Sequence, residues 1–82
     1  QGHHTSELEI ICTNQMGMLA DLGAACKTHN ININRMEATT LTDNKARLSL
    51  EVSVQDISQL KRLTRTIRQI SGVLRIDRVL NR

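Results

Sequence analysis

Hydrophobic and polar residues alternate along three stretches of the chain, and a period of two is typical of strands with one buried face. The clearest stretch is 46–54, where aliphatic residues hold the even positions and polar residues the odd ones. Residues 7–13 and 31–40 alternate less regularly, and 73–80 is rich in aliphatic residues without a clear inward parity. We therefore predict four strands, of which the third is the most strongly specified.

The second and third predicted strands are expected to form a hairpin. The apolar parity of the second strand changes midway, which predicts a β-bulge near Asn34 or Arg35. A three-residue turn at 43–45 gives the hairpin one uniformly apolar face, whereas a two-residue turn mixes apolar and charged residues there. The predicted cross-strand pairs join Met36, Ala38 and Thr40 to Val52, Leu50 and Leu48.

Helical spacing replaces the alternation in two segments. In the first, Leu19, Leu22 and Cys26 recur on one side of a helix of about three to four turns. Asn14 is the expected N-cap of this helix. Asn30 is expected to end it, because asparagine tolerates a left-handed backbone better than most residues.

The second helical segment opens with Asp56 and Gln59, whose spacing resembles a capping box. An apolar stripe follows, and Gly72 lies where glycine commonly ends a helix. The stripe comprises Ile57, Leu60, Leu63, Thr64, Ile67 and Ile70. The order strand, helix, strand, strand, helix, strand predicts a ferredoxin-like βαββαβ sandwich of the α+β class, with a four-stranded antiparallel sheet and both helices on one face.

The composition fits one small domain. The chain has 82 residues, of which 39% are hydrophobic and 23% charged, and we expect no membrane span. Aromatic residues are absent, so the core lacks the side chains that bury the most area, and we expect a second copy to add stability. Residues 1–5 are expected to be a disordered terminus or a cloning remnant on an excised fragment, which leaves 6–82 as the domain.

The residue types exclude several kinds of chemistry. Cys12 and Cys26 fit neither a disulfide framework nor a CxxC or zinc site, so we interpret them as small buried residues of a cytoplasmic protein. His3 and His4 lie in the terminus set aside above, and no metal site is expected. His29 has no nucleophile near it in sequence and is interpreted as a polar residue at a helix end. We predict no catalytic residues and no cofactor.

Two features remain as candidate binding sites. Gly17 precedes a helix whose free amides attract a carboxylate or phosphate, although a small residue is equally useful in a tight turn. Lys61, Arg65 and Arg68 share one side of the second helix and form either a solvated face or a non-specific contact with RNA phosphates. The net charge of +3 favours phosphate-rich partners without requiring them, and the absence of aromatic side chains argues against RNA reading by base stacking.

Two segments resemble a known family. The run from Asn14 to Leu22, N-Q-M-G-M-L-A-D-L, with N-I-N-I at 30–33, resembles the ACT-domain pattern D-R-x-G-L-L-A-D-I followed by N-I-N-I. The run from Ile67 to Arg78, I-R-Q-I-S-G-V-L-R-I-D-R, is similar to the I-x-x-I-x-G-V-x-x-V-x-R ending of one branch. That branch is the C-terminal ACT domain of RelA/SpoT-type (p)ppGpp synthetase/hydrolases. The resemblance covers nearly the whole chain.

The resemblance implies a regulatory, non-catalytic domain of a GTP pyrophosphokinase, with strand order 4-1-3-2. Such a domain is expected to form a homodimer through ACT–ACT pairing and to relay starvation signals in the stringent response, in contact with the ribosome. The alternative that it implies is an amino-acid-sensing ACT domain of a biosynthetic enzyme or its regulatory subunit. In amino-acid-binding members the ligand lies near the glycine loop, which by position corresponds here to Asn14, Met16, Gly17 and Leu19, with Asn32 nearby. Asn14 stands where the family pattern has an acidic residue.

Overall fold

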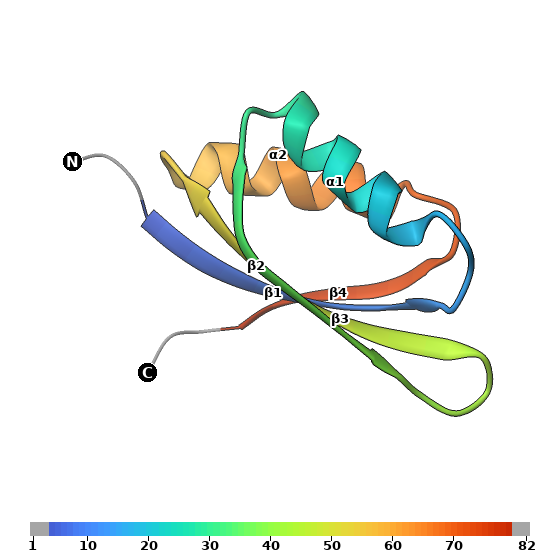
Figure 1. Cartoon of the computed structure of the whole chain (residues 1–82). Coiled ribbons are helices and arrows are strands. Elements are labelled where there is room, and N and C mark those ends of the chain that lie inside the picture. The colour runs from blue at the N-terminus through green and yellow to red at the C-terminus, as the bar shows by residue number, and fades with distance from the viewer. Residues whose placement is uncertain (1–3, 80–82) are drawn as a thin grey trace.

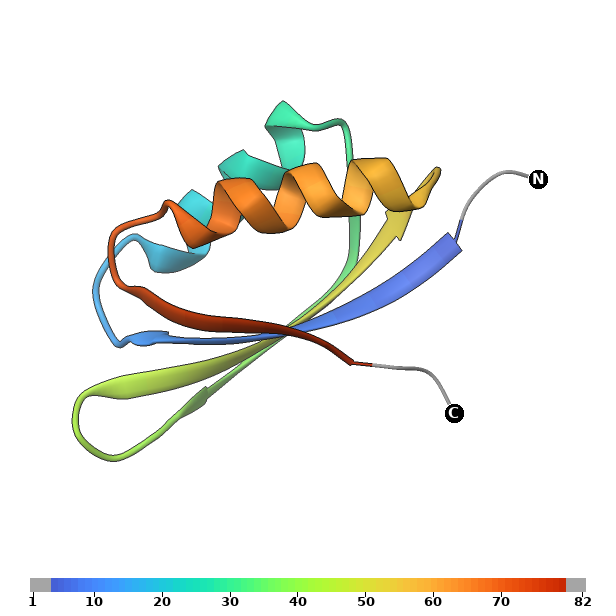
Figure 2. The same ribbon diagram turned by 180° about the vertical axis from the view of Figure 1, so that it is seen from behind.

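The computed structural model describes residues 4–79, which form four strands and two helices (Figure 1). The elements are β1 (His4–Thr13), α1 (Met18–Thr28), β2 (Asn32–Thr40), β3 (Lys45–Val54), α2 (Ile57–Arg68) and β4 (Val73–Val79). The strands make one antiparallel sheet in the order β2-β3-β1-β4, and both helices lie on the same side of it (Figures 1 and 2). This confirms the predicted α+β sandwich and the strand order 4-1-3-2.

The first strand begins before the position at which the domain was expected to start. His4 and Thr5 pair with Val54 and Ser53 of β3, so two residues of the expected terminus belong to the sheet. Residues 1–3 and 80–82 lie outside the described residues. The expectation of a disordered terminus therefore stays a prediction for residues 1–3.

The core lies between the helices and the inner face of the sheet. Leu8 and Ile10 of β1 stand opposite Leu50 and Leu48 of β3, and each of the four is at most 2% exposed. Leu22 of α1 and Leu63 and Ile67 of α2 belong to the same cluster and are equally buried. Burial of each such side chain contributes about 1.5–3 kcal/mol, so the alternation along β3 is the main reason that the helices cover this face.

The opposite face of the sheet is polar, which explains why neither α1 nor α2 covers it. Its side chains come from the odd positions of β1 and β3, which are half-buried or exposed. Ion pairs on this face join Arg47 to Glu9 at 3.0 Å, Arg75 to Asp77 at 2.7 Å and Arg35 to Glu51 at 3.7 Å. These pairs are exposed, so they favour solvation of the face more than they stabilise the fold.

The predicted hairpin has the right parity but the wrong register. Ala38 lies opposite Leu48, whereas the three-residue turn at 43–45 had placed it opposite Leu50. The observed turn also has three residues but lies one position earlier, at 42–44: Leu41 N donates to Lys45 O at 2.8 Å, and the turn takes Asp43 and Asn44 through left-handed backbone. A slip of two residues keeps every side chain on its face, so the hydrophobic pattern does not detect the error. The predicted bulge is confirmed, since the register shifts between Ile33 and Arg35.

The ends of α1 differ in how well they were predicted. The N-cap is Gly17, at φ 88°, and not Asn14. The Asn14 prediction is wrong because α1 begins only at Met18, three residues beyond the position that an Asn14 cap requires. Asn14 lies in the β1–α1 loop, where its backbone N–H donates to Asn44 O in the β2–β3 turn at 2.8 Å. The other end is as predicted, because Asn30 adopts a left-handed φ of 56° directly after the helix.

Gln59 joins the two helices. Its backbone N–H donates to Asp56 Oδ1 at 2.8 Å, which confirms half of the predicted capping box, and its Oε1 accepts from Gln55 N at 2.7 Å. Its Nε2 donates to the carbonyl oxygen of His29 at the end of α1, at 2.9 Å. His29 Nε2 in turn lies 2.7 Å from Thr66 Oγ1 of α2. His29 is therefore a helix-end residue, as predicted, that also connects α1 to α2.

We predict that Gln59→Leu lowers the free energy of unfolding by about 1–3 kcal/mol, because the substitution leaves Gln55 N and His29 O without their partner. The matched control is Gln69→Leu, at an exposed position where about 0.5 kcal/mol or less is expected. Urea denaturation followed by circular dichroism measures both. Equal stability of the two variants would contradict the role given to Gln59.

Candidate functional site

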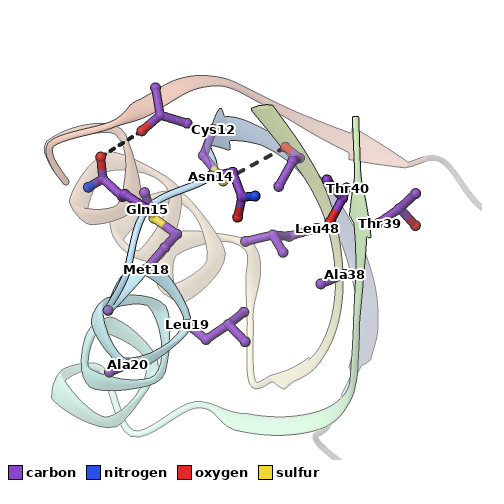
Figure 3. A pocket seen from close by; sticks show the side chains of 13 residues that line it. Cys12, Asn14, Gln15, Met18, Leu19, Ala20, Ala38, Thr39, Thr40 and Leu48 are labelled. Carbon is purple, nitrogen blue, oxygen red and sulfur yellow. Dashed lines mark hydrogen bonds between the residues drawn. The ribbon is translucent and has the colours of Figure 1, made fainter. Parts of the chain in front are cut away.

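A cavity of about 380 Å³ opens between the β1–α1 loop, the first turn of α1 and the β2–β3 hairpin (Figure 3). Leu19 of α1 lines one side, and Leu48 of β3 with Ala38 of β2 lines another. Asn14 and Thr40 add polar groups to the lining. We call this cavity the loop pocket. Its small residues on the hairpin leave the space that larger side chains would fill.

The start of α1 gives the loop pocket an electropositive end. Gly17 turns the chain into the helix at φ 88°, and Asp21 N then donates to Gly17 O at 2.9 Å. Within the described residues no side chain caps this end of α1. The amide of Met18 donates to Gln15 O at 3.4 Å, so the next two backbone amides, those of Leu19 and Ala20, are the ones available to an anion, which the helix dipole also favours.

The β1–α1 loop is fastened to two other turns. Thr13 N donates to Gly72 O at 2.8 Å, and Asn14 N donates to Asn44 O at 2.8 Å. The side chain of Gln15 accepts from Thr13 Oγ1 at 2.7 Å and donates to Ser71 O at 3.0 Å. We call this set of hydrogen bonds the loop clamp. It connects the loop pocket to the α2–β4 turn on one side and to the β2–β3 turn on the other.

Gly72 is required by the loop clamp for two reasons. Its φ of 99° lies in the region that side chains disfavour. A Cβ atom there would also lie 2.7 Å from Thr13 Oγ1 and 2.9 Å from Gln15 Cδ. The prediction that Gly72 caps the second helix is wrong, because α2 ends at Arg68 with Gln69 as its C-cap. Gly72 instead turns the chain into β4 and lies against the β1–α1 loop, a contact that sequence alone does not reveal.

The structure brings together three of the five residues assigned to ligand binding. Asn14, Gly17 and Leu19 line the loop pocket. Met16 is fully exposed and lies outside the pocket lining. Asn32 belongs to a separate shallow groove at the other end of β2, where its side chain donates to Asn34 Oδ1 at 2.9 Å. Ligand binding by any of the five stays a prediction.

The hairpin side of the loop pocket was missed by the sequence analysis. Ala38, Thr40 and Ala46 line it together with Leu48. Their inward parity was predicted correctly, but they were interpreted only as core. The signal available in the sequence was the small size of residues that face the end of the sheet nearest Gly17.

The two cysteines are buried, in agreement with their interpretation as small core residues. Burial raises the pKa of the Cys12 thiol and of the Cys26 thiol above the ordinary value. Cys12 Sγ also lies 3.8 Å from Ala46 O, next to the loop pocket. Because the thiolate is the reactive form, these side chains are poorly suited to nucleophilic chemistry.

The three cationic residues assigned to RNA contact are all exposed on α2. Lys61 and Arg68 face the neighbouring strand β4, where they line a groove with Arg78. Arg65 is not part of that groove lining. Of the three residues predicted to share one side of the helix, two therefore line the groove beside β4 and the third does not. Contact with RNA stays a prediction.

Comparison with protein families decides what kind of domain this is. The family model of the ACT domain matches residues 1–78. The chain belongs to the ACT-domain family. ACT domains are regulatory modules, and this one shares 29% identity over 72 residues with a GTP pyrophosphokinase of Myxococcus xanthus. That match covers 88% of this chain and 10% of the relative, so this ACT domain spans about a tenth of the relative's length.

Solved structures agree with this assignment at the level of the fold. The crystal structure of the ACT domain from the GTP pyrophosphokinase of Chlorobium tepidum aligns with a TM-score of 0.80 at 18% identity, covering 94% of this ACT domain and 99% of that chain. The C-terminal domain of the MgtC protein from Mycobacterium tuberculosis aligns with a TM-score of 0.79 at 14% identity, covering 96% and 88%. Neither helix of the described residues is long and apolar enough to cross a membrane.

Three glycine variants test the loop clamp. We predict that Gly72→Ala lowers the free energy of unfolding by about 1–3 kcal/mol, from left-handed strain and from the contacts with Thr13 and Gln15. Gly17→Ala, at φ 88° but with no atom within 4 Å of the added Cβ, should lose only the strain, about 1 kcal/mol. Gly23→Ala in α1, with open space around it, should gain up to about 1 kcal/mol.

Thermal and urea denaturation of the three variants separate these effects. A Gly72→Ala protein no less stable than the Gly17→Ala protein would show that the contact of Gly72 with the β1–α1 loop does not contribute.

Proposed function

We propose that this ACT domain is the non-catalytic regulatory domain of a RelA/SpoT-type GTP pyrophosphokinase, and that it relays signals in the stringent response in the cytoplasm. The M. xanthus relative and the ending from Ile67 to Arg78 support this parent. The loop pocket with its clamp carries the proposal, because it gives the domain a place to sense a small molecule and a connection to a second turn. The synthesis and hydrolysis of (p)ppGpp are assigned to the remaining part of the parent.

A small amino acid is the ligand that we assign to the loop pocket. Its carboxylate fits the free amides at the start of α1, and its side chain fits against Leu19 and Leu48. A volume of about 380 Å³ lies within the usual range for small-molecule sites. The same chemistry fits an amino-acid-sensing ACT domain of a biosynthetic enzyme or its regulatory subunit, which is the second candidate function.

A second copy of the domain is proposed to pair along the β2 edge. β2 contacts only β3 among the described strands, and it lies beside the loop pocket through Ala38 and Thr40. The neighbouring helix α1 carries one acidic and one basic residue, Asp21 and Lys27, and is thus neutral. Symmetric pairing at the β4 edge would instead bring together two copies of α2, which has four basic residues and no acidic ones, and their repulsion disfavours it.

We assign to the loop clamp the transmission of ligand binding from the loop pocket to the α2–β4 turn. A ligand shifts the balance between two states only as far as it binds one of them more tightly. Thr13 and Gln15 line the pocket and also bond Gly72 and Ser71, so a ligand that favours one loop conformation also favours one position of the α2–β4 turn. Ligand binding in the loop pocket thereby changes the position of the α2–β4 turn.

Calorimetry with small aliphatic amino acids tests the ligand proposal. We predict saturable binding to the unmodified chain and a loss of about tenfold or more in Ala38→Leu, because the larger side chain fills the pocket. The matched control is Ala24→Leu, on the exposed side of α1 and outside the pocket, which should bind as the unmodified chain does.

The outcomes separate the parts of the proposal. Absence of saturable heat with all twenty amino acids would reject the ligand. Equal affinity in the two variants would reject the loop pocket as its site. The gene sequence upstream of Gln1 tests the parent, since a biosynthetic enzyme encoded there would support the second candidate function instead.

A further inference from the structure

A second groove lies between α2 and β4, away from the loop pocket. These two elements are on the side that faces the viewer in Figure 2. It has a volume of about 190 Å³. The helix contributes Ile57, Lys61, Thr64 and Arg68, which recur every three or four residues and so lie on one side of α2. The strand contributes Ile76 and Arg78. We call this site the α2–β4 groove.

The α2–β4 groove combines exposed aliphatic surface with positive charge. Ile57, which lines the groove at one end of α2, is 47% exposed, and Leu74 of β4, which lies outside the groove lining, is 54% exposed. Within residues 4–79 no salt bridge involves Lys61, Arg68 or Arg78. The arginines on the outer face of the sheet are all close to carboxylates, whereas α2 carries four basic residues and none of them is in a salt bridge with another described residue.

Beside the groove lies a free strand edge. β4 pairs with β1 and with no other described strand. The outer edge of such a strand presents backbone N–H and C=O groups that can pair with an added strand. An extended chain placed there would direct alternate side chains toward α2, where cationic and aliphatic groups face it.

We propose that the α2–β4 groove binds an extended, acidic segment of a partner protein, which adds to β4 as a fifth strand. Carboxylates of the segment pair with Lys61, Arg68 and Arg78, and aliphatic side chains cover Ile57 and Leu74. A protein segment fits better than RNA because the exposed groups are aliphatic, the chain has no aromatic residue for stacking, and a strand edge recognises a polypeptide backbone.

This proposal goes beyond the function proposed above and does not depend on it. The α2–β4 groove shares no residue with the loop pocket. Failure of amino-acid binding therefore leaves the α2–β4 groove untouched, and failure of strand addition leaves the loop pocket untouched.

The test uses the 82-residue chain and a nine-residue probe peptide in which Glu alternates with Val and Thr. Fluorescence anisotropy at low salt measures affinity, and amide chemical shifts locate the bound peptide. We expect shifts along β4 and α2, and loss of binding when Gln replaces each Glu of the peptide. Lys61→Gln combined with Arg68→Gln should weaken binding about tenfold, because both charges face the groove.

Arg62→Gln combined with Arg65→Gln is the matched control, since it removes the same charge from α2 outside the groove lining. It should weaken binding by less than about threefold, through long-range attraction alone. Ile57→Ser should also weaken binding, measured at a temperature at which circular dichroism shows this variant to be folded. Equal losses in the two double variants, unmoved β4 amides, or tighter binding of a twelve-nucleotide single-stranded RNA at these residues would overturn the proposal.

Discussion

The attachment of the β1–α1 loop to two distant turns is the constraint on which the other features depend. Consecutive residues, Thr13 and Asn14, donate in opposite directions, one to Gly72 and the other to Asn44. These bonds fix where β1 ends and where the chain can enter α1. They hold the first turn of α1 beside the hairpin with the loop pocket between them, whereas unanchored loops usually move freely.

Two surfaces of different chemistry result from this arrangement. The loop pocket lies at the end of the sheet where three turns meet, and the neutral β2 edge is next to it. The α2–β4 groove lies on the other side, is cationic, and adjoins the free edge of β4. The α2–β4 turn lies between the two regions, because Ser71 and Gly72 accept hydrogen bonds from the β1–α1 loop and directly precede β4. A regulatory domain needs such a route between a ligand site and a contact surface.

Local periodicity predicted the elements, the parity of the hairpin and the bulge near Asn34, because each depends on backbone geometry that neighbouring residues specify. It did not predict the hairpin register or the N-cap of α1. The loop and the turn concerned contact each other through the bond from Asn14 N to Asn44 O, which joins residues thirty positions apart that meet only in the folded chain. The pocket walls at Ala38 and Ala46 escaped notice for a related reason, since a small side chain creates space only where its surroundings are already placed.

Hydrogen exchange of the Thr13 and Asn14 amides in the ligand-free chain tests the central claim most directly. If the loop clamp holds the pocket open before any ligand arrives, both amides exchange at rates close to those of the buried centre of β1, with opening free energies near that of global unfolding. Exchange of both amides at the rates of an unstructured peptide, while the centre of β1 remains protected, would contradict the claim.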